Sequence, residues 1–144
     1  MLLESLRAFF AAQPDVRLAY LFGSLARGDA GPRSDVDLAV VLDSPPEARG
    51  RRRDDLHAQV MELLGRNDVD LVLADGAPAL LRHRIARGRC LWAREPVEAT
   101  RFAGAALRDY EDTRPLRQAA ASALARRLAL GEFGRPAVYR RVHG

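Results

Sequence analysis

The hydrophobic positions of the chain alternate between helical spacing and short continuous runs, a pattern typical of a sheet covered by helices. Apolar residues from Leu2 to Phe10 recur at helical spacing and predict an amphipathic helix over residues 2–13, which ends before Pro14. A strand covered on both faces shows no alternation, so continuous apolar runs predict buried strands. These runs span residues 16–22, 36–42 and 69–74, and residues 90–92 add a short edge strand.

Helix signals occupy the segments between these strands. Residues 44–47, Ser-Pro-Pro-Glu, supply an N-cap serine, a proline at the first helical position and a glutamate three residues after the serine. This capping box predicts a helix that runs to about Leu64. Residues 78–87 also read as helical, with Gly88 as a left-handed C-terminal cap. Strands separated by helices indicate an α/β (α+β) fold.

The last third of the chain is rich in alanine and leucine and predicts a helical arm. Pro115 marks a kink or a break in it, because proline removes a helix hydrogen bond, and Thr113 can cap the second part. The length of 144 residues is that of one ordinary domain. We therefore expect a single domain over residues 1–144, with its core at about 1–95, the arm at about 97–130 and a loosely ordered tail at 131–144.

The basic residues exclude two classes of enzyme. All 23 of them are arginine, so the lysine that a Walker-type phosphate loop or a Schiff-base mechanism needs is absent. Against 19 acidic residues they give a formal net charge of +4, which is compatible with anionic partners such as nucleotides but identifies no ligand.

Cysteine content and hydropathy indicate the compartment. Cys90 is the only cysteine, which excludes an intrachain disulfide and a cysteine-clustered zinc site. No apolar run approaches the roughly 18 residues of a membrane span, and the N-terminus lacks a basic leader. We therefore expect a cytoplasmic protein without a membrane partner.

Candidate chemistry is concentrated where the first two strands meet. Gly23 and Ser24 follow a buried strand and begin a short helix, so free backbone amides and a hydroxyl suit a phosphate there. Asp35 and Asp37, two residues apart at the start of the next strand, share one face. Carboxylates about 4 Å apart repel by roughly 4 kcal/mol at an effective dielectric constant of about 20, so the pair calls for a cation. With only oxygen ligands and substrate phosphates, Mg²⁺ is the expected ion.

Each part of this pattern alone is more typical of a helix cap or a strand-edge turn. Four conditions occur together, however: Gly-Ser after an apolar strand, a ten-residue gap, an Asp-x-Asp triplet, and a carboxylate inside a third strand. Asp70 is our choice for that third carboxylate, because it shares a strand face with Val72, whereas Asp68 precedes the apolar run and Asp75 follows it. The joint pattern predicts a site for a magnesium-bound nucleotide.

Two polar residues beside this pattern are weaker candidates for nucleotide binding. Arg27 offers a planar fork for a phosphate, but equally closes a surface turn against Asp29. Ser34 is more typical of a local cap than of a ligand.

Arginine runs at residues 49–53 and 82–89 have a solvated face as their default interpretation, with steering of ATP or of an acidic partner as the alternative. No aromatic residues are interleaved with them, so we expect no direct nucleic-acid binding.

These motifs together resemble the nucleotidyltransferase superfamily of DNA polymerase beta. The similarity is closest to its minimal nucleotidyltransferases (MNT), the antitoxins of HEPN/MNT toxin–antitoxin pairs. It covers about residues 1–120 and rests on the spacing from Gly23-Ser24 to Asp35-Val36-Asp37, and on Ala26-Arg27-Gly28, Val69-Asp70-Leu71-Val72, Leu80 to Ile85, and Asp109 to Asp112.

The resemblance implies a small mixed sheet flanked by helices, with ATP held at Gly23 and Ser24 and two magnesium ions bridged by Asp35 and Asp37. Asp70 completes the triad in this scheme, binds one metal and helps to deprotonate the attacking hydroxyl. Arg27 and Ser34 are the further candidates for nucleotide binding. The implied reaction is AMP transfer to a tyrosine of a partner HEPN ribonuclease toxin, which would silence the toxin in a hetero-oligomeric complex.

Two alternatives remain open from the sequence. An antitoxin can neutralise its toxin by binding alone, with nucleotide bound but no transfer. The same chemistry can also adenylylate a small hydroxylated molecule such as an aminoglycoside, although relatives with that activity generally carry a sizeable second domain, for which this chain offers only the helical arm.

Overall fold

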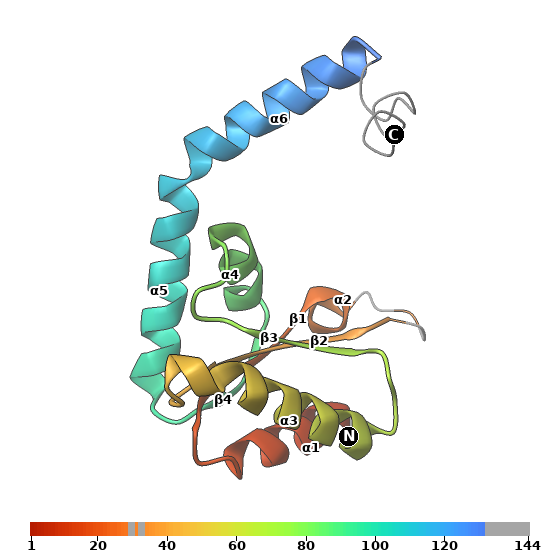
Figure 1. Cartoon of the computed structure of the whole chain (residues 1–144), viewed down its shortest axis with the longest axis vertical. Coiled ribbons are helices and arrows are strands. Elements are labelled where there is room, and N and C mark those ends of the chain that lie inside the picture. The colour runs from red at the N-terminus through yellow and green to blue at the C-terminus, as the bar shows by residue number, and fades with distance from the viewer. Residues whose placement is uncertain (29–30, 32–33, 132–144) are drawn as a thin grey trace. The chain divides into compact units, whose positions relative to one another are not determined.

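A four-stranded mixed sheet forms the centre of the fold (Figure 1). The computed structural model describes residues 1–28, 31 and 34–131, and chain contacts divide the protein into a unit of residues 1–110 and a unit of residues 111–144. The strands of the first unit are β1 (Val16–Phe22), β2 (Val36–Leu42), β3 (Val69–Leu73) and β4 (Arg89–Ala93), in the spatial order β3-β2-β1-β4. β1 is antiparallel to β2 and β4, whereas β2 and β3 are parallel. The predicted small mixed sheet is confirmed.

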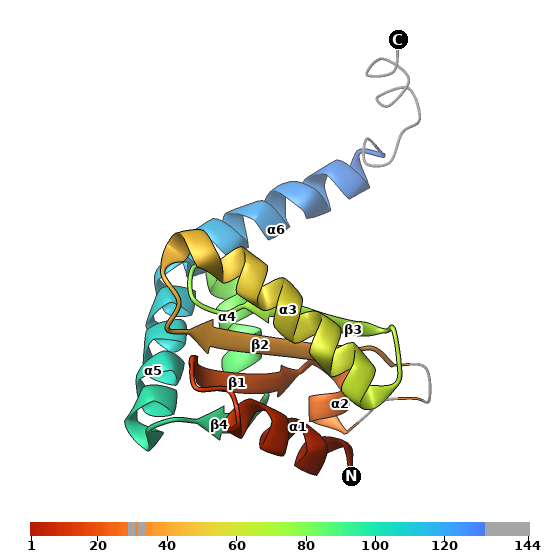
Figure 2. The same ribbon diagram turned by 60° about the horizontal axis from the view of Figure 1, so that its bottom comes forward.

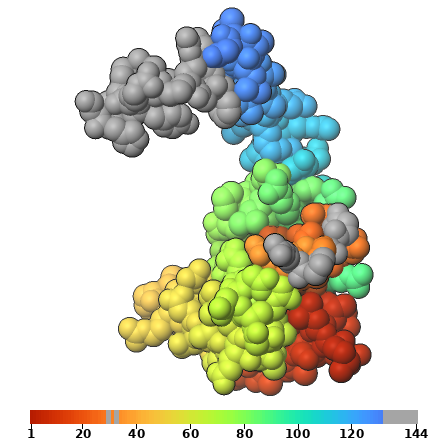
Figure 3. All heavy atoms as spheres, turned by 90° about the vertical axis from the view of Figure 1, so that its right-hand side faces the viewer, coloured from red at the N-terminus to blue at the C-terminus, as the bar shows by residue number. Residues whose placement is uncertain are grey.

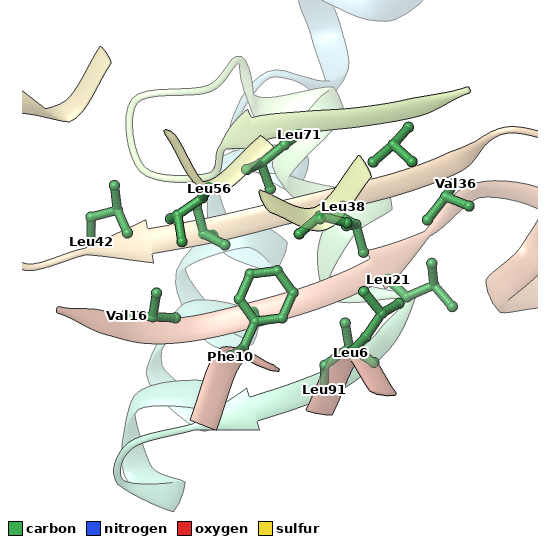
Figure 4. Packing of buried hydrophobic residues seen from close by; sticks show 14 residues of the cluster. Leu6, Phe10, Val16, Leu21, Val36, Leu38, Leu42, Leu56, Leu71 and Leu91 are labelled. Atoms are coloured by element: carbon green, nitrogen blue, oxygen red, sulfur yellow. The ribbon is translucent and has the colours of Figure 1, made fainter. Parts of the chain in front are cut away.

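Two helices cover one face of this sheet, one from the segment before β1 and one from the segment after β2. Figure 2 shows α1 (Leu2–Ala11) and α3 (Pro46–Leu64) on this face. Phe10 of α1 and Leu56 of α3 are fully buried against strand residues such as Leu38 (Figure 4). Burial of such side chains contributes about 1.5–3 kcal/mol each.

The other face is covered by α4 (Ala79–Ala86) and α5 (Pro96–Asp112). Ile85 of α4 is fully buried there, and the ring of Phe102 lies 5.4 Å from that of Tyr20 between centroids. Side chains alternate between the two faces, and both faces are buried. This double burial explains why β1 and β2 are continuous apolar runs in the sequence.

The start of α3 differs from the capping box that the sequence predicts. The helix begins at Pro46 and ends at Leu64 as expected, but its N-cap is Pro45 and no side chain caps it. The Ser44 hydroxyl instead lies 3.4 Å from Oδ2 of Asp15. Asp15 accepts two hydrogen bonds from the Arg52 guanidinium at 2.7 and 2.9 Å, and this interaction holds the pKa of Asp15 below its usual value. The prediction was wrong because a distant ion pair competes for the serine.

Gly88 does not form the predicted left-handed cap. α4 ends at Ala86, and Arg87 follows it in a right-handed conformation. A Cβ atom at position 88 would lie 2.3 Å from the carbonyl oxygen of Leu21 and 3.0 Å from Phe22. Glycine is required here because the backbone after α4 packs directly against the end of β1.

The break in the C-terminal helical region is confirmed, with α6 spanning Arg114–Ala129 and proline in its first turn. α5 begins at Pro96, within one residue of the predicted start of the arm at about 97. Thr113 occupies the N-cap position but caps no backbone amide; its hydroxyl accepts a hydrogen bond from Arg117 at 2.6 Å. Apart from residue 131, the predicted loose tail lies outside the described residues. None of the described helices combines the length and hydrophobicity that crossing a bilayer requires.

Candidate active site

The Asp37 side chain of β2 lies so close to the backbone at the end of β1 that only glycine fits at position 23. α2 (Gly23–Arg27) follows β1 directly, and Gly23 has a φ of +75°. A Cβ atom at this position would lie 2.4 Å from Oδ2 of Asp37. The backbone of Gly23 therefore lies directly against the Asp37 carboxylate, which brings the Gly-Ser and Asp-x-Asp motifs together.

Strand pairing places two of the predicted carboxylates beside each other. Asp37 of β2 and Asp70 of β3 are register partners on parallel strands, which lie about 4.8 Å apart in a sheet and present paired side chains on one face. Asp35 lies just before β2, two residues from Asp37, and its charge acts on Asp37. Burial raises the pKa of Asp37, and the negative charges of Asp70 and Asp35 raise it further. The carboxylate of Asp37 is thus repelled by both of the other carboxylates.

The two alternatives to Asp70 are engaged elsewhere. Asp68 accepts a hydrogen bond from Arg66 at 2.5 Å, and this arginine holds the pKa of Asp68 below its usual value. Asp75 lies 3.1 Å from the Arg49 guanidinium. Asp70 is exposed and faces Asp37, so the geometry favours it as the third carboxylate.

This donor set fits magnesium held together with a phosphate ligand. Among residues 1–28, 31 and 34–131, no group of three or more His, Cys, Asp or Glu side chains is arranged to hold a metal ion by itself. Mg²⁺ is usually bound by one or two carboxylates plus substrate phosphates rather than by a protein cage. Crowded carboxylates with a raised pKa at Asp37 gain from such a cation.

A pocket of about 440 Å³ opens beside Asp37, within the size range of about 300–1,000 Å³ of small-molecule sites. Its walls come from the end of β1, from α2, from β2 and from the end of α4. α2 (orange) and α4 (green) lie next to each other on the face shown in Figure 3. The lining residues are Phe22, Gly23, Ala26, Arg27, Asp37, Arg84, Arg87 and Gly88.

The sequence of the chain matches a known protein family over the residues that form this pocket. The family described as "Polymerase beta, Nucleotidyltransferase" matches residues 4–96, which include both glycines of the pocket and all three carboxylates. The chain belongs to this nucleotidyltransferase family. No match was found among curated protein sequences.

Solved structures extend the similarity of this nucleotidyltransferase beyond the family match. A chain of the complex described as "Crystal structure of the toxin-antitoxin with AMP-PNP" is 25% identical with a TM-score of 0.70, covering 85% of this chain and 98% of that one. A chain of "the toxin-antitoxin MntA-HepT" is 25% identical with a TM-score of 0.62, covering 85% and 92%. The fold also matches a chain of the tri-AMPylated Shewanella oneidensis HEPN toxin in complex with MNT antitoxin, at 23% identity, a TM-score of 0.65 and coverage of 87% and 99%.

The site of this nucleotidyltransferase gathers some of the predicted residues and leaves others aside. Gly23, Asp37 and Arg27 line the pocket. Ser24 lies half-buried in α2 next to Gly23, outside the pocket lining. The Ser34 hydroxyl accepts a hydrogen bond from the amide of Gly31 at 2.9 Å, as expected of a local cap. The alternative partner of Arg27, Asp29, lies outside the described residues.

Sequence reasoning missed the contribution of α4 to this pocket. Arg84 and Arg87 were assigned by default to a solvated face, yet both line the pocket beside Asp37. Their spacing of three residues puts them on one side of the helix, while Arg82 points to the other side and pairs with Asp109. Spacing within the basic run was the available signal, but the packing of α4 against β1 was needed to interpret it.

Proposed function

We propose that this protein is a magnesium- and ATP-dependent protein adenylyltransferase and an antitoxin, which transfers AMP to a tyrosine of a HEPN-domain toxin in a cytoplasmic complex. The observation that carries the proposal is the crowding of Asp37, which rests on the backbone of Gly23 and faces Asp70 across the strand pair. Family membership and the resemblance to chains from toxin–antitoxin complexes, one of them with AMP-PNP, support it.

The three carboxylates have distinct parts in the proposed reaction. Asp35, Asp37 and Asp70 would hold two magnesium ions, which when bound neutralise charge that develops on the phosphates. Asp70 is exposed and takes the proton of the tyrosine hydroxyl as general base. The hydroxyl oxygen then forms a bond to the α-phosphorus, and the bond from that phosphorus to the oxygen bridging to the β-phosphate breaks. AMP remains on the tyrosine, and pyrophosphate leaves.

A protein acceptor is supported by the surface of α6. No residue of this helix is buried. Four leucines of the helix and its C-cap are exposed: Leu116, Leu124, Leu128 and Leu130. Leu116 alone exposes 73% of its surface. Most of the stability of a helix comes from packing an apolar face rather than from helix propensity, so the leucines suit a surface that another protein covers. Such binding also favours the second candidate function, neutralisation by occlusion alone.

Loss of the Asp-x-Asp carboxylates separates transfer from occlusion. We expect the double variant Asp35→Ala/Asp37→Ala to bind the HEPN partner as wild type does but to lose neutralisation, because the metal-binding carboxylates are gone while α6 is untouched. Complex formation is measured by pull-down, and neutralisation by growth of cells that express the toxin.

A matched control is Asp54→Ala/Asp55→Ala, which removes two carboxylates from α3, outside the pocket. This variant should still neutralise the toxin. Full neutralisation by Asp35→Ala/Asp37→Ala would contradict catalysis and establish occlusion instead.

A further inference from the structure

The pocket beside Asp37 has a cationic wall that lies outside the Gly-Ser and Asp-x-Asp motifs. Arg84 and Arg87 of the α4 segment line it together with Arg27, against a single lining carboxylate, that of Asp37. Within residues 1–28, 31 and 34–131, neither Arg84 nor Arg87 makes an ion pair or hydrogen bond through its guanidinium group. Arg82 and Arg94, by contrast, pair with carboxylates. Two guanidinium groups are thus left to bind an anion.

The position of this wall is fixed by packing on three sides of α4. Ile85, which lies between the two arginines in the sequence, is fully buried in the core. On another side, Arg82 binds Asp109 and the ring of His83 stacks on that of Tyr110, with centroids 3.8 Å apart and planes 9° from parallel. Gly88 closes the third side against the Leu21 carbonyl. The end of α4 is therefore locked to the same strand end that positions Gly23 and Asp37.

The pocket presents the Asp37 carboxylate and the two arginines from different elements, β2 and the α4 segment. The phosphate that reacts must lie beside the carboxylate of Asp37, on the wall formed by β2. Arg84 and Arg87 line the pocket from α4 and present planar forks suited to phosphate oxygens. We propose that Arg84 and Arg87 form a polyphosphate subsite, which binds the β- and γ-phosphates of ATP and then the leaving pyrophosphate, and so selects triphosphates over monophosphates. This inference rests on the proposed function for the identity of the nucleotide.

The test compares the affinity for two nucleotides in two variants. Arg84→Gln and Arg87→Gln are titrated with AMP-PNP plus Mg²⁺, and with AMP plus Mg²⁺, by isothermal titration calorimetry. A hydrogen bond to a charged group contributes about 1.5–3 kcal/mol, so each variant should bind AMP-PNP about tenfold or more weakly. Affinity for AMP should change by less than about twofold, because AMP lacks the phosphates that the arginines contact.

Arg51→Gln is the matched control, since it removes an exposed arginine of α3 outside the pocket. Thermal melting establishes that all three variants are folded. Equal losses for AMP-PNP and AMP, or no difference from Arg51→Gln, would overturn the subsite, as would a wild-type chain that does not bind AMP-PNP. A wild-type chain that binds AMP-PNP through these arginines but transfers no AMP would keep the subsite and refute the proposed function.

Discussion

Replacement of Asp70 by asparagine is expected to lower the rate of AMP transfer by about 10²–10⁴-fold, the usual contribution of a general base. The asparagine side chain has nearly the same shape but cannot take the proton of the attacking hydroxyl, and it is a weaker metal ligand than a carboxylate. Asp70 is exposed on β3 and pairs in register with Asp37, so the substitution should leave the fold intact. The rate is measured as pyrophosphate release in the presence of the partner.

Asp68→Asn and Asp75→Asn are the matched controls for this variant. Both remove a carboxylate within five residues of Asp70, yet those carboxylates pair with Arg66 and Arg49. We expect both controls to transfer AMP at close to the wild-type rate. A large loss at Asp68 or Asp75 with normal transfer by Asp70→Asn would show that the third carboxylate is misassigned.

Gly23→Ala is expected to abolish transfer and to destabilise the fold. The new methyl group would meet the Asp37 carboxylate at 2.4 Å, and alanine would have to adopt a φ of +75°. Left-handed backbone at a residue other than glycine costs about 1–3 kcal/mol, and the collision displaces Asp37 in addition. A misplacement of about 1 Å can cost about 10²-fold in rate. Thermal melting and pyrophosphate release report the two effects.

Gly28→Ala separates these two causes. Gly28 has a φ of +78°, but nothing lies within 4 Å of a Cβ atom built there. This variant should therefore show the destabilisation caused by the left-handed backbone alone, while retaining most of the transfer activity. Equal loss of activity in both variants would mean that backbone strain, rather than contact with Asp37, explains the effect of Gly23→Ala.

The strands could be predicted closely from the sequence because burial on both faces leaves a direct mark on it. The runs at residues 16–22 and 36–42 coincide with β1 and β2, and the third run exceeds β3 by one residue. Proline also marked the break before α6. These signals are local, so no knowledge of the tertiary structure was needed to interpret them.

Two predictions from local motifs were wrong because residues distant in the sequence decide the local geometry. Ser44 has the sequence of a helix cap, but the Asp15–Arg52 pair engages its hydroxyl. Gly88 follows a helix in the manner of a left-handed cap, but β1 is what requires it to be glycine. The residues that compete, Asp15 for Ser44 and Leu21 for Gly88, are each more than 25 residues away in the chain, where a pattern confined to a few neighbours carries no information.

The candidate site shows the same division. Spacing alone pointed to Gly23, Asp35 and Asp37, whereas the direct contact of Gly23 with Asp37 and the pairing of Asp37 with Asp70 depend on strand register. The cationic wall depends on how α4 packs against the end of β1. A run of arginines cannot reveal which members face a pocket until that packing is known.

The most direct test of AMP transfer is the intact mass of a HEPN-domain protein encoded beside this chain. The protein is expressed alone and then incubated with this chain, ATP and magnesium. We predict a mass increase by whole AMP units, matched by released pyrophosphate and absent without magnesium or with Asp35→Ala/Asp37→Ala. An unchanged mass despite a stable complex would contradict transfer and leave neutralisation by binding.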